Sequence, residues 1–587
     1  MAREPITLVE IDVGGCGRVF GVGACTATLS GGVVRKCYNT FATCAAPTVF
    51  LPAVKTLTFA DPRPNMPRGG STIFPAVKSV SVMAATVNIA GSDEGSGPLG
   101  RRATIAVDLS DFPYHDRGID PYVAERISGA AQTDEAGYDP AARGSFFGKL
   151  RARWPYYGGR ALRIKQGFID GGALVDMVTR NFVITEMTAP DDLGRVRLEA
   201  EDPLSLLAND RAVYPAINQG ALLVGIDAVA TSATLTPVGI GATYAASGEL
   251  VIGSEILAFT RAVDVLTFTA RAVAGTVAAS HTAGDTVQTV GVFDAVRLDD
   301  AVARLCLAAP GFAPALLPLA TWAAEVTRWA PDVLVRTRIT SPTGIGLLLG
   351  ELMVLGVSIW WDDFGQTVGL KCNRPPDSDT VFEITEKSNL LSFEAEDRNS
   401  ARLTDIVFAT VQTDPTKGVS GYDNFKRAAW TFDPKAKDSR AYGDTRIRKI
   451  LSRWFNNGED SAVLVLSQRL LKRFSSAPIK ATMTLDAKDT AIRLTDVLRV
   501  TSRAFTDATG RQVPTLLQVT GRSDPKPGQT IEITAQAYQF DGRYGFATVD
   551  TQGDYATATA AEKLAGNFAV DETTLLFTDG TAPYEAI

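Results

Sequence analysis

Four cysteines near the start of the chain are the residues whose type and spacing could do chemistry. Cys16, Cys25, Cys37 and Cys44 are four of only six cysteines in 587 residues, and they lie in a Gly- and Thr-rich stretch without helical periodicity. Such a stretch predicts turns and short strands, from which thiols can act as ligands. The four positions are separated by eight, eleven and six residues.

Three kinds of site compete for four thiols. Two disulfides would need an oxidising compartment, and the N-terminal stretch MAREPITLVEID has no apolar signal segment, so disulfides are disfavoured. Structural zinc usually takes pairs of cysteines two to four residues apart, and this spacing does not occur here. An iron–sulfur cluster can take ligands from separated loops, although the common ferredoxin spacings do not match either. Spacing leaves zinc and a cluster open, and four unliganded, packed thiols are the remaining alternative.

Length and composition indicate several domains. A chain of 587 residues with 45% hydrophobic content allows about four domains of roughly 150 residues. The longest apolar stretch, residues 345–361, contains Glu351 and is shorter than the ~20 residues of a spanning helix, so no membrane segment is predicted. The net charge of −7 is mild and does not favour nucleic-acid binding. A short basic run is expected to be a solvated face; it consists of Arg446, Arg448, Lys449 and Arg453.

Period-two alternation predicts a mainly β, multidomain chain with a few short helices, that is, a β-rich α+β fold. Helical spacing of apolar residues occurs at 296–307 and 342–356, and a hairpin is predicted directly after the second helix. Cys306 and Cys372 fall inside these apolar elements, where buried, unliganded thiols are expected.

Two distant stretches follow the same plan. Residues 182–200, FVITEMTAPDDLGRVRLEA, and residues 517–535, LQVTGRSDPKPGQTIEITA, each consist of a strand, an acidic turn with proline and glycine, and a second strand. The likeness predicts an internal repeat and hence two related β domains, against the alternative of two unrelated ones.

The sequence offers little support for an enzyme. His115 and His281 are the only histidines and lie in unrelated loops, so a paired-histidine metal site is excluded and a Ser-His-Asp triad cannot be assigned. P-loop and GxSxG motifs do not occur. Paired carboxylates such as Asp362 and Asp363 fall in predicted turns, where Asp is favoured because it hydrogen-bonds the backbone. No catalytic residue is predicted.

The cysteine region resembles that of tail-tip (baseplate) hub proteins of long-tailed phages and gene transfer agents. The resemblance rests on the spacings Cys16-x8-Cys25 and Cys37-x6-Cys44, on the string KCYNTFATC, and on the later stretch SDFPYHDRGIDPY. In this family, typified by the phage lambda tail tip protein L, four cysteines hold a [4Fe–4S] cluster. The resemblance therefore implies that Cys16, Cys25, Cys37 and Cys44 are the iron ligands. In the lambda protein this region is expected near the end, whereas here it opens the chain.

The resemblance also implies a structural virion protein and not an enzyme. The expected protein is a homotrimeric hub at the tail tip or baseplate of a virion, assembled in the host cytoplasm, that forms a passage or plug for DNA ejection. Expected partners are a distal tail protein, a receptor-binding tail-tip or fibre protein, the tape-measure protein and a tail peptidase, with DNA only in transit. Two tube-like β domains per chain would let three chains present six similar domains to a hexameric tail tube.

The expected domains are a cysteine-rich segment (1–60), a first tail-tube-like β domain (61–220), an inserted β module (221–295), an α+β hub domain (296–395), a second tail-tube-like β domain with its preceding helix (396–545) and a C-terminal tail (546–587). Two alternatives belong to other classes of protein. One is a bacterial iron–sulfur redox protein with β accessory domains, and the other is a zinc-containing adhesin.

Overall fold

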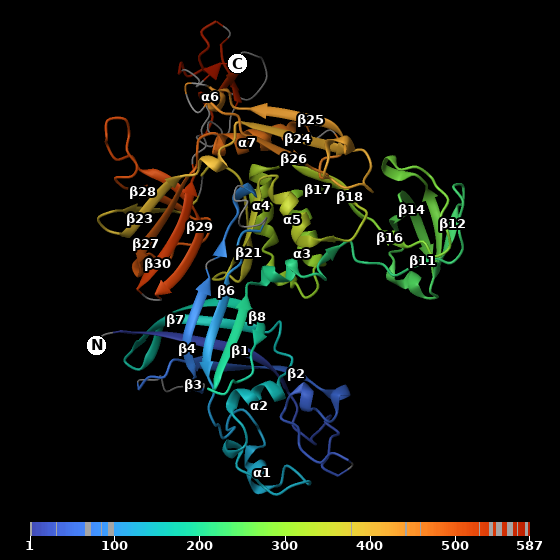
Figure 1. The fold of residues 1–587 in the computed structure, drawn as a ribbon, viewed down its shortest axis with the longest axis vertical. Coiled ribbons are helices and arrows are strands. Elements are labelled where there is room, and N and C mark those ends of the chain that lie inside the picture. The colour runs from blue at the N-terminus through green and yellow to red at the C-terminus, as the bar shows by residue number, and fades with distance from the viewer. Residues whose placement is uncertain are drawn as a thin grey trace.

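The computed structural model describes residues 3–30, 32–64, 72–83, 85–91, 99–376, 379–438, 440, 443–457, 460–526, 529–538, 544–546, 554–559, 567–571, 573–581 and 585–586. Parts of the predicted turn at 523–528 and of the predicted tail at 546–587 lie outside these residues. Figure 1 shows two β domains, a central helical part and a small β module at one side. The predicted mainly β, multidomain fold with short helices is confirmed. Within the described ranges, none of the helices has the length and apolar character needed to cross a membrane.

The first β domain is an eight-stranded sheet. In sheet order its strands are β3 (Ile73–Pro75), β2 (Pro52–Ala60), β1 (Glu4–Cys16), β7 (Ala161–Asp170), β8 (Ala173–Met187), β9 (Arg195–Glu201), β6 (Thr104–Ser110) and β4 (Val77–Met83). Alternate residues point inward, as in β6, where Ile105, Val107 and Leu109 are buried and their neighbours are only half-buried. Because β1 pairs with both β2 and β7, the division expected at residue 60 runs through this sheet.

The chain between β6 and β7 forms two short helices beside this sheet. α2 (Phe146–Arg153) buries Phe146, Phe147 and Leu150 in the core of the sheet, and the ring of Phe147 stacks on Phe59 of β2 with centroids 5.5 Å apart. α1 (Val123–Ser128) lies farther from the sheet (Figure 1) and contacts the segment that joins β1 to β2. This connection therefore ties the cysteine-containing segment to the β domain.

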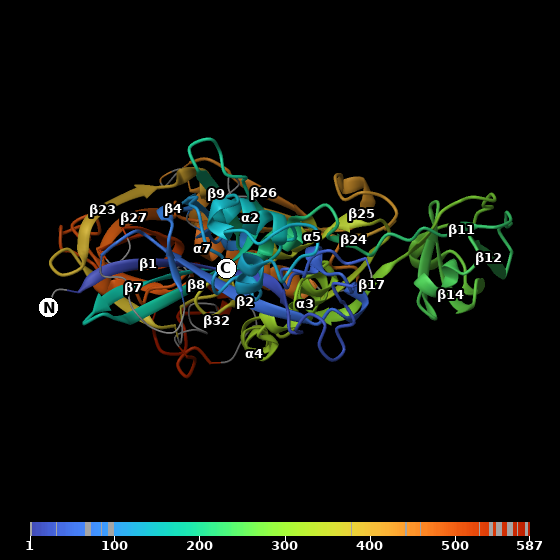
Figure 2. The ribbon, with the colours of Figure 1, turned by 90° about the horizontal axis from the view of Figure 1, so that it is seen from below.

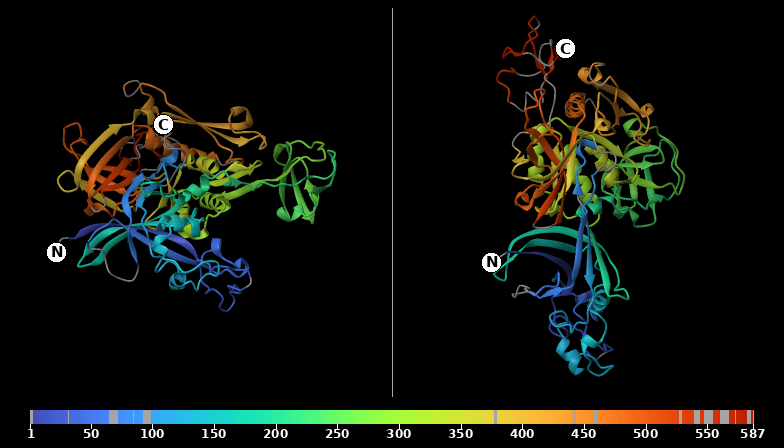
Figure 3. Two further views of the ribbon diagram at one scale, coloured as in Figure 1. Left: turned by 60° about the horizontal axis from the view of Figure 1, so that its bottom comes forward. Right: turned by 60° about the vertical axis from the view of Figure 1, so that its left-hand side comes forward.

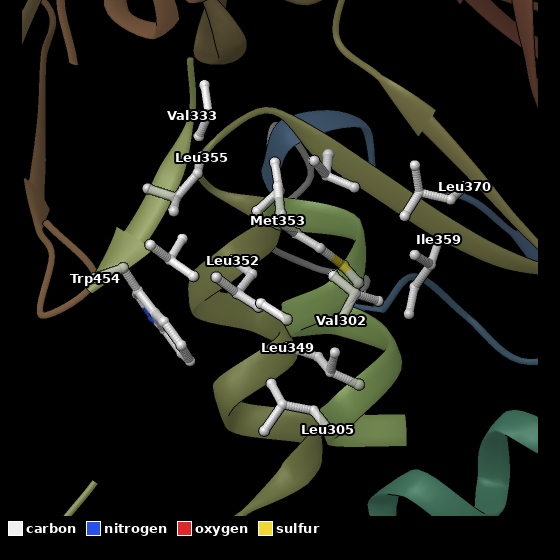
Figure 4. Packing of buried hydrophobic residues seen from close by; sticks show 14 of the residues in the cluster. Val302, Leu305, Val333, Leu349, Leu352, Met353, Leu355, Ile359, Leu370 and Trp454 are labelled. Atoms are coloured by element: carbon white, nitrogen blue, oxygen red, sulfur yellow. The ribbon is translucent and has the colours of Figure 1, made fainter. Parts of the chain in front are cut away.

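The largest apolar core lies in the central part of the molecule. It is built from four helices and two two-stranded sheets. The helices are α3 (Leu298–Ala308), α4 (Leu319–Trp329), α5 (Ile345–Met353) and α7 (Asp460–Phe474), and the sheets are β17–β18 (Gly291–Arg297, Leu334–Ile339) and the hairpin β20–β21 (Val357–Asp362, Thr367–Cys372). Figure 4 shows Leu349, Leu352 and Met353 of α5 in this core, together with Val302 of α3 and Trp454. Both predicted helices and the hairpin after the second are confirmed, because α3, α5 and β20–β21 occupy these positions.

A three-stranded sheet covers α7. Its order is β25 (Phe425–Phe432), β24 (Asp405–Gln412) and β26 (Ile447–Leu451), and its inner face places Ile406, Phe408 and Ile450 in the central core. The predicted burial of the two remaining cysteines is confirmed as well. Cys306 and Cys372 are both buried in this core.

The inserted module is a six-stranded sheet with a core of its own. In sheet order its strands are β11 (Ala221–Leu222), β12 (Ser232–Thr236), β15 (Val265–Ala270), β14 (Glu255–Ala262), β13 (Ser247–Ile252) and β16 (Val287–Thr289). Leu250, Leu257, Phe259 and Leu266 are buried between them. Figures 1 and 2 show that the module stands at one side of the molecule, away from both β domains.

The second β domain repeats the topology of the first. Its sheet order is β22 (Val381–Thr385), β28 (Val497–Thr501), β29 (Thr515–Lys526), β30 (Thr530–Ala537), β27 (Ile479–Asp486) and β23 (Leu390–Asp397). In chain order, β23, β27, β28, β29 and β30 correspond to β4, β6, β7, β8 and β9. In both domains the first strand pairs with the second, the second with the fifth, the fifth with the fourth and the fourth with the third, always antiparallel.

The repeat extends to a local irregularity. In the β8–β9 hairpin the register shifts directly after the pair Ile184–Ala200. In the β29–β30 hairpin it shifts directly after the pair Val519–Ala535, which occupies the same position in the aligned stretches. Because bulges re-aim a strand and are specific local features, their recurrence confirms the internal repeat predicted between residues 182–200 and 517–535.

The two β domains are joined by strand pairing and by ion pairs. β5 (Ala85–Thr86), which lies between β4 and β6, pairs with β29 of the second domain, and Val87 N–H donates to the carbonyl of Thr520 at 2.7 Å. Arg180 of β8 forms an ion pair with Asp524 of β29, and another with Asp363 in the turn between β20 and β21 of the central part. In Figure 3 the first domain lies below the second, and strands of the first domain run up between them.

Candidate metal centre

Cys16 and Cys37 are held in place through Asn39. Cys16 is the last residue of β1, and its N–H donates to the carbonyl of Asn39 at 2.9 Å. The Asn39 side chain donates back to the Cys16 carbonyl at 2.7 Å. Asn39 has a positive φ of 61°, a left-handed conformation that Asn tolerates better than most residues. The chain therefore turns two residues after Cys37 and returns to the end of β1.

Cys25 and Cys44 lie on tight turns. The Cys25 N–H donates to the carbonyl of Val22 at 3.2 Å, in a turn where Gly21 and Gly23 both have positive φ. Cys44 follows a single 3₁₀ turn, η1 (Phe41–Thr43), and its N–H donates to the carbonyl of Phe41 at 3.1 Å. Turns and a strand end present all four thiols, as the sequence predicts.

The Cys37 thiol is influenced electrostatically by the other three thiols of the segment. Burial raises the pKa of the Cys37 thiol, and the thiolates of Cys44, Cys25 and Cys16 raise it further, while the Asn39 N–H lowers it. Electrostatic effects between side chains of this kind need short separations. All six cysteines of the chain are free thiols. Cys16, Cys25 and Cys44 thus lie within electrostatic range of Cys37, but among the described residues the four thiols are not arranged as the ligands of a metal ion.

A small apolar core backs this site. Phe20, Ala27 and Tyr122 are buried, and Cys25 and Cys37 pack against them. The Tyr122 hydroxyl accepts a hydrogen bond from the Phe20 N–H at 2.7 Å. Burial raises the pKa of Tyr122, and the nearby thiolates of Cys37 and Cys25 raise it further. Tyr122 therefore connects the thiols to the chain that precedes α1.

Arg126 of α1 joins the cysteine segment to the first β domain. Its Nη2 donates to the carbonyl oxygens of Lys36 and Cys37 at 2.9 and 3.0 Å. Its Nε donates to Asp120 at 3.0 Å, in an ion pair whose two side chains are each 1% exposed. A guanidinium supplies several donors in a fixed plane, so one side chain can satisfy both the carboxylate and the two carbonyls.

Tyr38, the neighbour of Cys37, lies between two guanidinium groups. Arg126 and Arg153 lie 4.0 and 4.2 Å from its ring centroid. Arg153 also forms an ion pair with Asp116 at 2.6 Å. The Tyr38 hydroxyl lies 3.0 Å from that of Tyr138. Stacked cations and hydroxyl pairing therefore fix the residue next to a predicted ligand.

The donor set of this site suits an anionic cluster. The thiolates of Cys16, Cys25, Cys37 and Cys44 would hold the irons of a [4Fe–4S] cluster. Two buried guanidinium donors of this region, Arg126 Nη1 and Arg18 Nε, have no hydrogen-bond partner among the described residues, and such donors favour an anionic group. In the described part of the chain, no group of three or more His, Cys, Asp or Glu side chains is placed to hold a metal ion.

The remaining cysteines and the two histidines have structural surroundings. Burial raises the pKa of Cys306 and of Cys372 to about 12, which keeps both thiols protonated. His115 accepts the N–H of Arg117 at 3.1 Å within its own loop. His281 lies 2.9 Å from the buried carboxylate of Glu255 in the inserted module, far along the chain from His115.

Three residues that position the site were not predicted from the sequence. Asp120, Tyr122 and Arg126 follow the loop that contains His115, and all three are buried. The stretch SDFPYHDRGIDPY was noted for its resemblance without a structural role, and it contains Asp120 and ends at Tyr122. The signal available was an Asp and an Arg six residues apart, flanking a Tyr, in a stretch rich in turn residues.

The chain is similar to several solved structures. No protein-family model and no curated protein matches the chain. The tail protein from Neisseria meningitidis MC58 is 9% identical with a TM-score of 0.33, over 78% of this chain and 96% of that chain. The prophage MuSo2 43 kDa tail protein from Shewanella oneidensis is 10% identical with a TM-score of 0.33, over 78% of this chain and 97% of that chain. A chain of the virion of a native gene transfer agent particle is 16% identical with a TM-score of 0.25, over 38% of this chain and 47% of that chain. Likenesses at this level assign no function to the chain.

Proposed function

We propose that this chain is a structural hub protein at the distal tip of a phage or gene transfer agent tail, in the virion. The hub is a homotrimer that joins the hexameric tail tube and distal tail protein to the receptor-binding tip and forms the DNA passage or plug. It holds a structural [4Fe–4S] cluster on Cys16, Cys25, Cys37 and Cys44. The proposal follows the resemblance of the cysteine region to hub proteins.

The observation that carries the proposal is the repeated β sheet. Five strands recur with the same sheet order, the same antiparallel pairing and the same register shift in the β8–β9 and β29–β30 hairpins. Three chains with two such domains contain six similar sheets. Six similar sheets can each contact one subunit of a six-fold ring, so a trimer can bind a hexamer through equivalent contacts. A single-copy β domain would offer a trimer only three equivalent surfaces.

The cluster would stabilise a segment that has little core of its own. Between β1 and β2 the described residues form only turns, bridges and two 3₁₀ turns, η1 and η2 (Pro47–Val49). Several large apolar side chains there are exposed, including Val19, Val22, Val34 and Phe41. When bound, a cluster ties its ligands together, and because it binds the folded segment its binding energy becomes folding energy.

The first experiment is to purify the protein anaerobically and measure iron, sulfide and zinc per chain together with the visible spectrum. We expect about four irons and four sulfides per chain with a broad brown absorption, as a [4Fe–4S] cluster requires. One zinc per chain would contradict the cluster and favour a zinc-stabilised β protein. A chain without bound metal would leave the four thiols as packing residues.

Serine variants assign the ligands. Cys16→Ser, Cys25→Ser, Cys37→Ser and Cys44→Ser are each expected to lower the iron content and to destabilise residues 17–51. Cys306→Ala and Cys372→Ala are the matched controls, because these cysteines lie in the central core. Equal iron loss in the controls and in the four variants would show that the loss reflects unfolding and not ligation. In the particle, normal infectious tails built with Cys37→Ser would refute a structural role for the cluster.

A further inference from the structure

Two edge strands of this chain are open to solvent and have the same length. β25 (Phe425–Phe432) ends the three-stranded sheet, and β23 (Leu390–Asp397) ends the sheet of the second β domain. In the part of the chain that the structure describes, each pairs with a neighbour on one side only. An open edge strand exposes backbone donors and acceptors to which another strand can pair.

The two edges differ in charge and share exposed apolar side chains. β25 carries Lys426 and Arg427, whereas β23 carries Glu394, Glu396 and Asp397. On β25, Trp430 is 64% exposed and Phe432 53% exposed; on β23, Leu391 is 61% exposed. Large apolar side chains exposed together on an edge indicate a contact surface. Asp405 accepts a hydrogen bond from Trp430 at 2.8 Å, so the indole is already oriented.

The hydrogen bonds inside each sheet determine which edge residues face outward. Asp433 N–H donates to the Thr404 carbonyl across the β24–β25 pair. Inward and outward residues alternate along a strand, so Ala428, Trp430 and Phe432 direct their backbone groups away from β24. Trp430 lies opposite Val407 in this register.

The same reasoning applies to β23. Arg398 N–H donates to the Pro478 carbonyl at 3.0 Å, across the β23–β27 pair. Alternation then directs the backbone groups of Asp397, Ala395 and Phe393 away from β27. An antiparallel pairing of the two edges must therefore match outward residues of β25 with outward residues of β23.

One register satisfies this condition along nearly the whole of both strands. It places Lys426 opposite Asp397, Ala428 opposite Ala395, and Trp430 opposite Phe393. Arg427 then stands opposite Glu396. A shift by two residues in one direction moves Lys426 from Asp397 to Ala395, and a shift in the other direction sets Arg427 against Arg398. Opposite charges and aromatic pairs stabilise facing positions in a sheet, and like charges destabilise them.

We propose that β25 of one chain pairs with β23 of a second copy, in this antiparallel register. Figures 1 and 2 place the two strands well apart, β23 at the left and β25 at the right of the central part. Two different surfaces meet in this contact, so the interface is head-to-tail. Such an interface forms a closed ring when the rotation that relates one chain to the next is a whole fraction of a full turn. The contact lies on elements other than the cysteine segment, and it concerns a surface that the proposed function does not specify.

Charge reversal tests the contact. The probe is the full-length wild-type chain, whose mass in solution is measured by light scattering over a range of concentrations. The expected mass is three times the 62.4 kDa of one chain. Lys426→Glu and Asp397→Lys should each raise roughly tenfold the concentration needed for assembly, because like charges then face each other. The double variant Lys426→Glu/Asp397→Lys should restore assembly, and Lys449→Glu, an exposed lysine on β26 of the same sheet, should leave it unchanged.

Cross-linking tests the register. Ala428 and Ala395 face each other as a hydrogen-bonded pair, whose Cα atoms lie about 5.5 Å apart, within the range that a disulfide spans. The double variant Ala428→Cys/Ala395→Cys should form covalent dimers and trimers on mild oxidation. Ala429→Cys/Ala395→Cys should not, because the side chains of residues 428 and 429 point to opposite faces of the sheet. The single variants control for bonds to the native cysteines.

Several outcomes would overturn the pairing. These are a wild-type chain that stays monomeric, single reversals without effect on assembly, or equal cross-linking of residues 428 and 429. Iron per chain, measured on the same variants, separates this contact from the cluster. Full iron in chains that do not assemble contradicts the pairing alone, whereas assembled chains without iron contradict the cluster alone.

Discussion

The guanidinium of Arg126 donates to the carbonyl oxygen of Cys37 at 3.0 Å and to the carboxylate of Asp120 at 3.0 Å. One buried side chain thus connects a predicted cluster ligand to the loop that precedes α1. The position of Cys37 depends on residues that lie about ninety positions later in the chain.

Replacing Arg126 should loosen the cysteine segment. Arg126→Met leaves the buried carboxylate of Asp120 without its cation, and breaking a buried pair in this way costs about 3–5 kcal/mol. We expect faster hydrogen–deuterium exchange in residues 17–51 and a loss of bound iron. Arg143→Met is the control, because Arg143 is 48% exposed and its pair with Glu135 should contribute at most about 1 kcal/mol. Unchanged exchange in Arg126→Met would contradict this role.

The inserted module should lose stability in acid because of Glu255. Burial alone would raise the pKa of this carboxyl, but hydrogen bonds from Arg271, Ala279 and His281 outweigh burial and lower the pKa from 4.5 to about 2. A carboxyl with a depressed folded pKa contributes its full stability above about pH 4.5. That contribution, on the order of 3 kcal/mol, is lost as the pH falls from 4.5 towards 2.

Calorimetry of the full chain between pH 6 and pH 3 can check this prediction. The transition of the module should shift to lower temperature as the pH falls, and Glu255→Gln should remove most of that shift while lowering stability at pH 6. Glu249→Gln, in the same module, should retain the shift. An identical pH dependence in wild type and Glu255→Gln would show that other groups cause it.

Truncating the centre of the largest core should be costly. Leu352 of α5 is fully buried (Figure 4), and Leu352→Ala should lower the free energy of unfolding by about 2–5 kcal/mol because it leaves a cavity. Leu347→Ala on the same helix should change it by less than about 0.5 kcal/mol, since Leu347 is 59% exposed. Urea unfolding followed by tryptophan fluorescence reports on this core through Trp322 and Trp454. Equal effects of the two substitutions would contradict the packing described.

Local patterns predicted much of the fold. The helices at α3 and α5, the β20–β21 hairpin and the repeated β8–β9 and β29–β30 hairpins follow from apolar spacing and turn residues within a few positions of each other. The pairing of β1 with β7 was not foreseen, because it joins strands separated by most of the first domain. Expected domain boundaries therefore placed residue 60 between domains, although β2 belongs to the same sheet.

The candidate site also combines residues that the local sequence predicted with residues that it did not. Four cysteines within a short segment could be singled out from their type and spacing alone. The residues that hold them, Asp120, Tyr122 and Arg126, carry no such signal, because their role depends on how α1 lies against the loop at residues 36–39. Candidate ligands can thus be predicted from residue type and spacing, whereas the residues that support them depend on contacts made only after folding.

The pairing of β5 with β29 has a consequence for synthesis of the chain. Thr86 and its partner Gly521 are separated by more than four hundred residues. At about 5–20 residues per second, a ribosome needs roughly 20 to 90 seconds between them. During that time the early part of the chain emerges without the strand against which residues 85 and 86 will lie. The sheet of the second β domain thus includes a strand made long before its other strands, and such long-range closure slows folding.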